Sequence, residues 1–170
     1  MLNLIIGGAG SGKSAFAEEL VRRLPGQRVY LATMEPTDEE SRARIARHRA
    51  QRAPCGFTTI ERCTELSGAP LPAGANVLLE DLANLLANEL FSPNGGGADA
   101  VRRGLASVCA RCASLTVVTN ELFSGGTDYA GDTLAYLKEL ALLNRELAAQ
   151  SELCVEVVCG LPHVLKGELP

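Results

Sequence analysis

The stretch Gly7-Gly8-Ala9-Gly10-Ser11-Gly12-Lys13-Ser14 decides the fold, because it matches the pattern G-x-x-x-x-G-K-S/T of phosphate-binding loops. The apolar run Leu2–Ile6 predicts a strand before it, and Ser14–Leu24 predicts an amphipathic helix after it. In such a loop the backbone N–H groups turn inward around phosphate oxygens, and the helix N-terminus adds partial positive charge. We expect Lys13 to reach the β- and γ-phosphates and the Ser14 hydroxyl to bind Mg²⁺.

Short apolar and β-branched runs alternate with helical stretches along the rest of the chain. Strands that read as nearly continuous apolar runs, separated by helices, indicate a mostly parallel sheet with helices on both faces. The sequence therefore predicts an α/β doubly wound P-loop NTPase, as a single domain over residues 1–170. Ser92–Asp99 and Ala69–Asn76 are expected to be loops. The further strands are expected at Arg28–Thr33, Phe57–Glu61, Asn76–Leu79, Leu115–Thr119 and Leu153–Cys159, and the longest helices at Leu82–Leu90 and Leu134–Gln150.

Composition and charge favour a small-molecule partner. The net charge of −4 gives no long-range attraction to nucleic acid or anionic lipid. With 4% aromatic residues, the chain also has few side chains on which nucleic-acid bases could stack. No run reaches the roughly 18–20 apolar residues of a membrane span, and no signal peptide is recognisable, so we expect a cytoplasmic protein. Cys109-x-x-Cys112 lacks a second pair or a histidine at ligand spacing, and is interpreted as neither a metal nor a redox site.

A pair of acidic residues follows another apolar run, in Val77-Leu78-Leu79-Glu80-Asp81. P-loop enzymes place a carboxylate at the end of a second strand, where it binds Mg²⁺ directly or through water. Either Glu80 or Asp81 could take that role, and the sequence leaves the choice open. The alternative is that both acids only begin the next helix, where negative charge is favoured.

A basic segment follows the strand expected at Arg28–Thr33. Thr37 and Glu40 form a capping-box pattern that predicts the start of a helix, and this helix has little apolar stripe. Arg44, His48 and Arg52 follow at intervals of four residues and would share one face. Neighbouring cations favour the neutral, nucleophilic form of an imidazole near neutral pH. By spacing alone, a solvated basic helix with an incidental histidine is the slightly better interpretation.

These segments, in order over nearly the whole chain, resemble the bifunctional adenosylcobinamide kinase / adenosylcobinamide-phosphate guanylyltransferase family of cobalamin assembly. The phosphate loop alone would not separate this family from its relatives, and the arginine-histidine block is the specific element. The matching stretches are Gly7–Ser14, Tyr30-Leu31-Ala32-Thr33, Arg44-Ile45-x-x-His48-Arg49-x-x-Arg52, Thr59-Ile60-Glu61, Val117-Val118-Thr119-Asn120-Glu121 and Val157-Val158-Cys159-Gly160-Leu161-Pro162.

The resemblance implies two reactions, a RecA-like sheet and assembly into homo-oligomers, as trimers. ATP or GTP would phosphorylate the hydroxyl of adenosylcobinamide, and GMP would then pass from GTP to the cobinamide phosphate through a histidine-bound GMP. His48 would be that nucleophile, as in covalent catalysis generally. By the same resemblance the nucleotide would contact the phosphate loop, Ala32, Thr33 and Met34, the stretch Arg49-Ala50-Gln51-Arg52, and Glu61.

Two other classes of protein compete with this interpretation. The first is a P-loop kinase that lacks the second reaction, since Gly10 and Phe57 stand where family members commonly have Arg and Trp. The second is a GTP-binding regulatory protein, for which Asp128-Tyr129-Ala130-Gly131 supplies a loose D-x-x-G match. No N-K-x-D follows that match, so we interpret it as chance.

Overall fold

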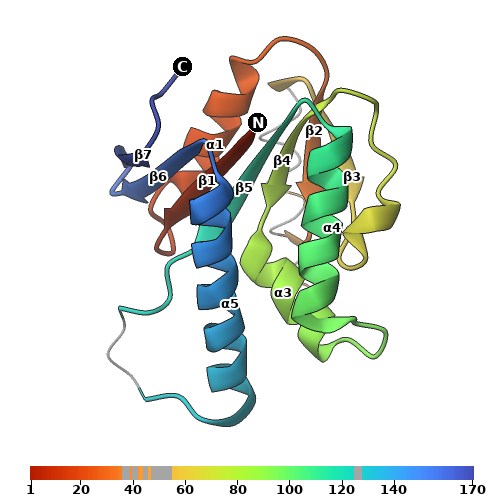
Figure 1. Ribbon diagram of the computed structural model, residues 1–170, viewed down its shortest axis with the longest axis vertical. Coiled ribbons are helices and arrows are strands. Elements are labelled where there is room, and N and C mark those ends of the chain that lie inside the picture. The colour runs from red at the N-terminus through yellow and green to blue at the C-terminus, as the bar shows by residue number, and fades with distance from the viewer. Residues whose placement is uncertain (36–38, 40–41, 44–45, 47–54, 125–127) are drawn as a thin grey trace.

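The computed structural model describes residues 1–35, 39, 42–43, 46, 55–124 and 128–170 (Figure 1). Most of the helix expected from Thr37 onward lies outside these residues; Glu39, Arg42, Ala43 and Ala46, which are described, are helical. The described strands are β1 (Leu2–Gly7), β2 (Arg28–Ala32), β3 (Phe57–Glu61), β4 (Asn76–Glu80), β5 (Ser114–Asn120), β6 (Leu153–Val158) and β7 (Leu161–Lys166). The helices are α1 (Lys13–Arg22), α3 (Leu82–Phe91), α4 (Gly97–Arg111) and α5 (Gly131–Gln150), with a short 3₁₀ helix η2 (Leu66–Gly68).

The described strands form one sheet in the order β3-β2-β4-β5-β1-β6-β7. Every neighbouring pair is parallel except β6 and β7, which run antiparallel. This confirms the P-loop α/β fold predicted from the sequence. Because the parallel strands point the same way, their carboxyl ends meet along one border of the sheet. We call this border the carboxyl edge; its six parallel strands end at Gly7, Ala32, Glu61, Glu80, Asn120 and Val158.

Alternating side chains of the central strands enter two separate cores. Leu4 of β1 and Val117 of β5 pack with α3, α4 and α5, whereas the next residues, Ile5 and Val118, pack with α1. Figure 1 shows α4 and α5 in front of the sheet. Both faces of the sheet are therefore covered, which explains why its inner strands read as unbroken apolar runs.

Two elements differ from the sequence prediction. Gly97–Asp99 was expected to end a loop, but it forms the first residues of α4, and α4, with 15 residues against 10 for α3, is longer than the helix expected at Leu82–Leu90. β7 was not predicted, and all six of its residues are exposed. Because its side chains enter neither core, β7 is held in place by its antiparallel backbone pairing with β6. Among the described residues, no helix is long and apolar enough to cross a membrane.

Gly104 tests how tightly α4 packs against the segment before it. A Cβ at Gly104 would lie 2.8 Å from Cβ of Leu66 in η2, closer than two side-chain carbons can approach. Gly104→Ala gains about 1 kcal/mol of helix propensity but overpacks this contact, typically at a cost of 1–3 kcal/mol. We expect urea unfolding to show a net loss of about 1 kcal/mol, and less than about 0.5 kcal/mol for Arg103→Ala on the exposed side of α4. A more stable Gly104→Ala protein would contradict the close packing.

Candidate nucleotide-binding site

The phosphate loop joins β1 to α1 at the carboxyl edge. Gly10 and Gly12 have φ angles of 69° and 91°, in the left-handed region that favours glycine, and Gly12 is the N-cap of α1. Because α1 begins at Lys13, the N–H groups of its first turn lack partners within the helix and face the loop. The Lys13 side chain is 8% exposed, and its Nζ donates a hydrogen bond of 3.2 Å to the carbonyl oxygen of Gly8. The loop thus gathers an ammonium group and helix N–H groups in one place.

The turn between β6 and β7 packs against this loop from the far end of the chain. The backbone N–H of Gly160 donates to the carbonyl oxygen of Ser11 at 2.8 Å. A Cβ placed on Gly12 would lie 3.2 Å from Cα of Gly160. Gly12 therefore meets two requirements, a positive φ and a close backbone neighbour. Nothing in the motif itself pointed to this support, which comes from the Val157–Pro162 block.

Ser14 and Glu80 connect the first helix to the end of β4. The Ser14 hydroxyl donates to Glu80 Oε1 at 2.5 Å, while Glu80 Oε2 is buried without a hydrogen-bond partner among the described residues. Burial raises the pKa of Glu80 from its ordinary 4.5 to about 7, and the charge of Asp81 adds to the rise; the Ser14 hydrogen bond and Lys13 oppose it. A buried carboxylate oxygen beside a hydroxyl is an arrangement that could hold a hard cation.

Asp81 is already engaged in the fold. Its Oδ1 accepts the backbone N–H of Asn84 at 2.7 Å and so caps α3, and Oδ2 lies 3.5 Å from the amide nitrogen of Asn120. Burial raises the pKa of Asp81, against the hydrogen bond from Asn84 and the charge of Lys13. The sequence left open which of the two acids would bind a metal ion, and the structure shows that they differ. Glu80 has a carboxylate oxygen without a hydrogen-bond partner among the described residues, whereas Asp81 caps a helix.

The end of β2 lies next to both acids. The N–H of Thr33 donates to the carbonyl oxygen of Glu80 at 3.1 Å, and its hydroxyl donates to that of Asp81 at 2.8 Å. Ala32 is in register with Glu61 of β3 and Glu80 of β4. The structure therefore brings the expected nucleotide segments Ala32–Met34 and Glu61 to the same edge as the phosphate loop. Thr33 is completely buried, and its side chain serves the fold.

His48 and the stretch Arg49–Arg52 lie outside the described residues. The structure shows where that part of the chain is attached: it follows the end of β2 and precedes β3. The first attachment point, after β2, is therefore next to the site, whereas the second, before Phe57, lies at the opposite border of the sheet, where Phe57 is in register with Arg28.

Sequence reasoning missed three amide side chains at this edge. Asn120 ends β5 beside the phosphate loop, in register with Gly7, and approaches Asp81. Asn144 of α5 is buried; its Oδ1 accepts from the Thr119 hydroxyl at 2.7 Å, and its Nδ2 donates to the carbonyl oxygen of Asn120. Asn88 of α3 donates to two carbonyl oxygens. A polar residue that interrupts an apolar helical stripe was the available signal for Asn88 and Asn144.

Fold and loop together define a P-loop nucleotide-binding protein, and comparisons with known proteins narrow that class. The chain belongs to the cobinamide kinase / cobinamide phosphate guanyltransferase family, which it matches over residues 3–165. It is 33% identical over 172 residues to the bifunctional adenosylcobalamin biosynthesis protein CobP of Pseudomonas aeruginosa, covering 99% of both chains. It is 32% identical over 183 residues to the protein CobU of Escherichia coli, covering 98% of this chain and 100% of the relative. The family predicted from the sequence is confirmed.

The raised pKa of Glu80 makes stability depend on pH in a defined direction. The folded protein holds this proton up to about pH 7, and the unfolded chain only to about 4.5, so the unfolding free energy falls as pH rises between these values. After allowance for the partial exposure of Glu80, the unfolding free energy falls by about 2 kcal/mol over this interval. In urea unfolding of the metal-free protein at pH 5 and pH 8, Glu80→Gln should lose less stability over this interval than wild type. The exposed Glu168→Gln serves as control, and an equal pH dependence in all three proteins would contradict the assignment.

Proposed function

We propose that this chain phosphorylates adenosylcobinamide with ATP or GTP, and then transfers GMP from GTP to the resulting cobinamide phosphate. The observation that carries the proposal is the phosphate loop with Lys13, beside the Ser14–Glu80 pair, in a chain that matches the family over almost its whole length. The relatives' names describe bifunctional proteins of adenosylcobalamin biosynthesis, which supports both reactions in one chain.

In the phosphoryl transfer, the described residues would bind and orient the triphosphate. Gly8, Ala9, Gly10, Ser11 and Gly12 would surround the phosphates with backbone N–H groups. Lys13 would exchange its contact with the Gly8 carbonyl for the β- and γ-phosphate oxygens, where negative charge develops during transfer. The substrate hydroxyl attacks the γ-phosphorus, the bond to the β-phosphate oxygen breaks, and the nucleoside diphosphate leaves.

Mg²⁺ fits the donors at this edge. The Ser14 hydroxyl and the spare oxygen of Glu80 are hard ligands, and Asp81 lies close enough to act through water. The described residues contain no group of three or more His, Cys, Asp or Glu side chains able to hold a metal ion, so phosphates and water would complete the coordination. When bound, the ion would neutralise phosphate charge. We propose Ser14 and Glu80 as its ligands, because Asp81 is occupied by its capping role.

In the second reaction we propose His48 as the nucleophile. An imidazole nitrogen attacks the α-phosphorus of GTP, the bond to the bridging oxygen breaks, and pyrophosphate leaves. A phosphate oxygen of the cobinamide phosphate then attacks the same phosphorus, the P–N bond breaks, and the histidine is regenerated. Ala32–Met34, Glu61 and the stretch Arg49–Arg52 would contact this nucleotide. Support comes from the family match and from the start of this segment, which follows β2 at the carboxyl edge.

We also propose a cytoplasmic homo-oligomer, a trimer by family resemblance. Cys109 and Cys112 are free thiols three residues apart, which suits a reducing compartment.

β7 exposes apolar residues on the sheet border, including Leu161 at 72% exposure, and such a surface favours a protein partner. Light scattering in solution measures the assembly directly.

Lys13→Ala should abolish phosphoryl transfer, because it removes the cation that faces the β- and γ-phosphates. The loss of a preorganised charge at the transition state typically costs at least about 100-fold in rate. The measurement is phosphorylation of adenosylcobinamide under saturating Mg²⁺-ATP or Mg²⁺-GTP. Lys138→Ala on the exposed side of α5 is the matched control and should retain the wild-type rate. A Lys13→Ala enzyme with near-normal turnover would refute the role of the lysine.

His48→Asn should abolish the guanylyl transfer while phosphorylation continues. The first measurement is the intact mass of the protein after incubation with Mg²⁺-GTP. Wild type and the control His163→Asn, the only other histidine of the chain, should gain the mass of one acid-labile GMP, and His48→Asn should gain none. Absence of the adduct from wild type that binds GTP would leave a P-loop kinase without the second reaction.

A further inference from the structure

Asn88 lies at the place where the ladder between β2 and β3 comes to an end. Just after the paired residues of the two strands, one more backbone hydrogen bond forms. The N–H of Arg62 donates to the carbonyl oxygen of Ala32 at 2.8 Å. One residue further on, the carbonyl oxygens of Thr33 and Cys63 share a single donor that comes from a helix. The side-chain nitrogen of Asn88 donates to both, at 2.8 Å to Thr33 and 3.0 Å to Cys63.

This contact requires a group with two donors. Two carbonyl oxygens repel each other, and a primary amide nitrogen is a neutral group that donates one proton to each. The Cys63 thiol extends the connection by one more residue, since Sγ lies 3.6 Å from the carbonyl oxygen of Met34. Asn88 thus fixes the distance between the chain that leaves β2 and the chain that leaves β3.

The helix that carries Asn88 is itself anchored at the site. α3 is capped by Asp81, and Asn88 follows seven residues later, two helical turns along the same side. The next residue, Glu89, is 3% exposed and accepts the N–H groups of Glu65 at 2.6 Å and Gly96 at 2.7 Å. These contacts place one helix between the carboxylates of β4 and the segment that follows β3.

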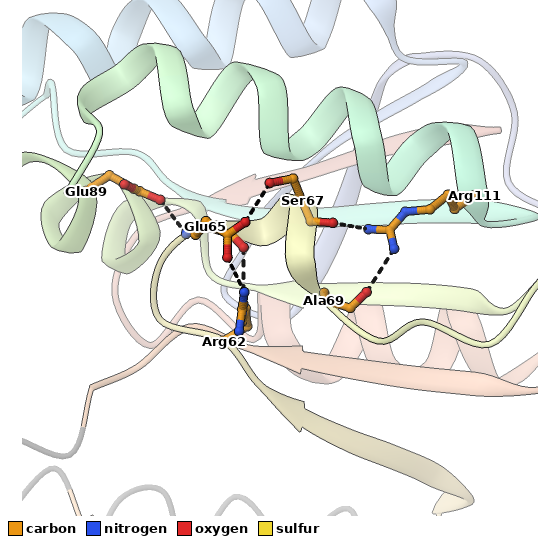
Figure 2. A network of polar contacts seen from close by, with 6 residues as sticks. All are labelled: Arg62, Glu65, Ser67, Ala69, Glu89 and Arg111. Atoms are coloured by element: carbon orange, nitrogen blue, oxygen red, sulfur yellow. Dashed lines mark hydrogen bonds and ion pairs between the residues drawn. The ribbon is translucent and has the colours of Figure 1, made fainter. Parts of the chain in front are cut away.

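The segment after β3 is held from its other side as well (Figure 2). Arg111 of α4 donates to the carbonyl oxygens of Ser67 at 3.1 Å and Ala69 at 2.8 Å. Arg62 and Ser67 both contact the Glu65 carboxylate. With α3 on one side and α4 on the other, this segment has little freedom to follow a change at Thr33. The amide of Asn88 therefore ties the end of β2 to this segment, in addition to the hydrogen bonds of Thr33 with the carbonyl oxygens of Glu80 and Asp81.

From these contacts we propose that Asn88 is a positioning residue for the guanylyl transfer. The chain that carries His48 leaves the described fold directly after Thr33–Glu35 and returns shortly before β3, so Asn88 fixes one of its two attachment points. Ala32–Met34 and Glu61, the proposed nucleotide contacts, flank the same amide. No hydrogen bond joins Asn88 to the side chains of Lys13, Ser14 or Glu80, and its partner Thr33 contacts Glu80 and Asp81 only through their backbone carbonyls, so we expect the larger effect on the second reaction. The inference rests on the proposed two-step function.

The test compares Asn88→Asp with Asn76→Asp, a matched change at the opposite border of the sheet. Asn76 is buried, and its nitrogen donates to the carbonyl oxygen of Pro25 at 2.8 Å, so both variants lose an amide donor to the backbone. Two rates are measured for each protein: formation of the GMP adduct from Mg²⁺-GTP, and phosphorylation of adenosylcobinamide. Thermal unfolding is recorded in parallel, and a comparable loss of stability is expected in both variants.

Asn88→Asp should slow adduct formation about tenfold, because small misplacements of reacting groups are costly, and should leave phosphorylation within about twofold. Asn76→Asp should leave the ratio of the two rates unchanged. If Asn88→Asp does not fold, Asn88→Ala removes the same donors without a negative charge and should change the ratio in the same direction. An unchanged ratio in the folded Asn88 variant would overturn this role alone. Wild type without an adduct would overturn the transferase function and this role together.

Discussion

The common direction of strands β1 to β6 is the constraint on which the rest of the molecule depends. It sends the phosphate loop, the acids after β4 and the end of β2 to one border, although more than 60 residues separate Ser14 from Glu80. Their hydrogen bond forms because β4 and β1 both lie next to β5 and end at the same border. The eight-residue motif meets the other residues of the candidate site through this long-range pairing, not through its own conformation.

Most of the fold could be predicted from the sequence because the inner strands are buried on both faces. Leu4-Ile5 and Leu78-Leu79 must be apolar at consecutive positions, and such runs are recognisable without a partner. β7 could not be found in this way. Its side chains enter no core, and Pro162 and Lys166 are poor strand signals, so only the hydrogen bonds to β6 define it. The start of α4 was hidden by Gly95–Gly97, which suggested a longer loop.

The site was predictable where local chemistry dictates it and not where distant contacts do. The phosphate loop, Lys13 and Ser14 follow from one continuous stretch. The difference between Glu80 and Asp81 depends on which of two adjacent carboxylates caps α3 and which contacts Ser14, and no spacing rule decides that. Asn88 reaches Thr33 across 55 residues of sequence, so its partners became evident only when the strands were placed.

The contact of Gly160 with the phosphate loop has a consequence for synthesis on the ribosome. The motif at residues 7–14 is translated first, but β1 pairs with β5 and β6, and the loop rests on a turn near the end of the chain. Chains are made at about 5–20 residues per second, so the loop waits roughly ten seconds or more for its neighbours. The nascent chain therefore exposes an incomplete sheet until β5 and β6 have been made, and the candidate site is complete only once the turn that contains Gly160 has also emerged.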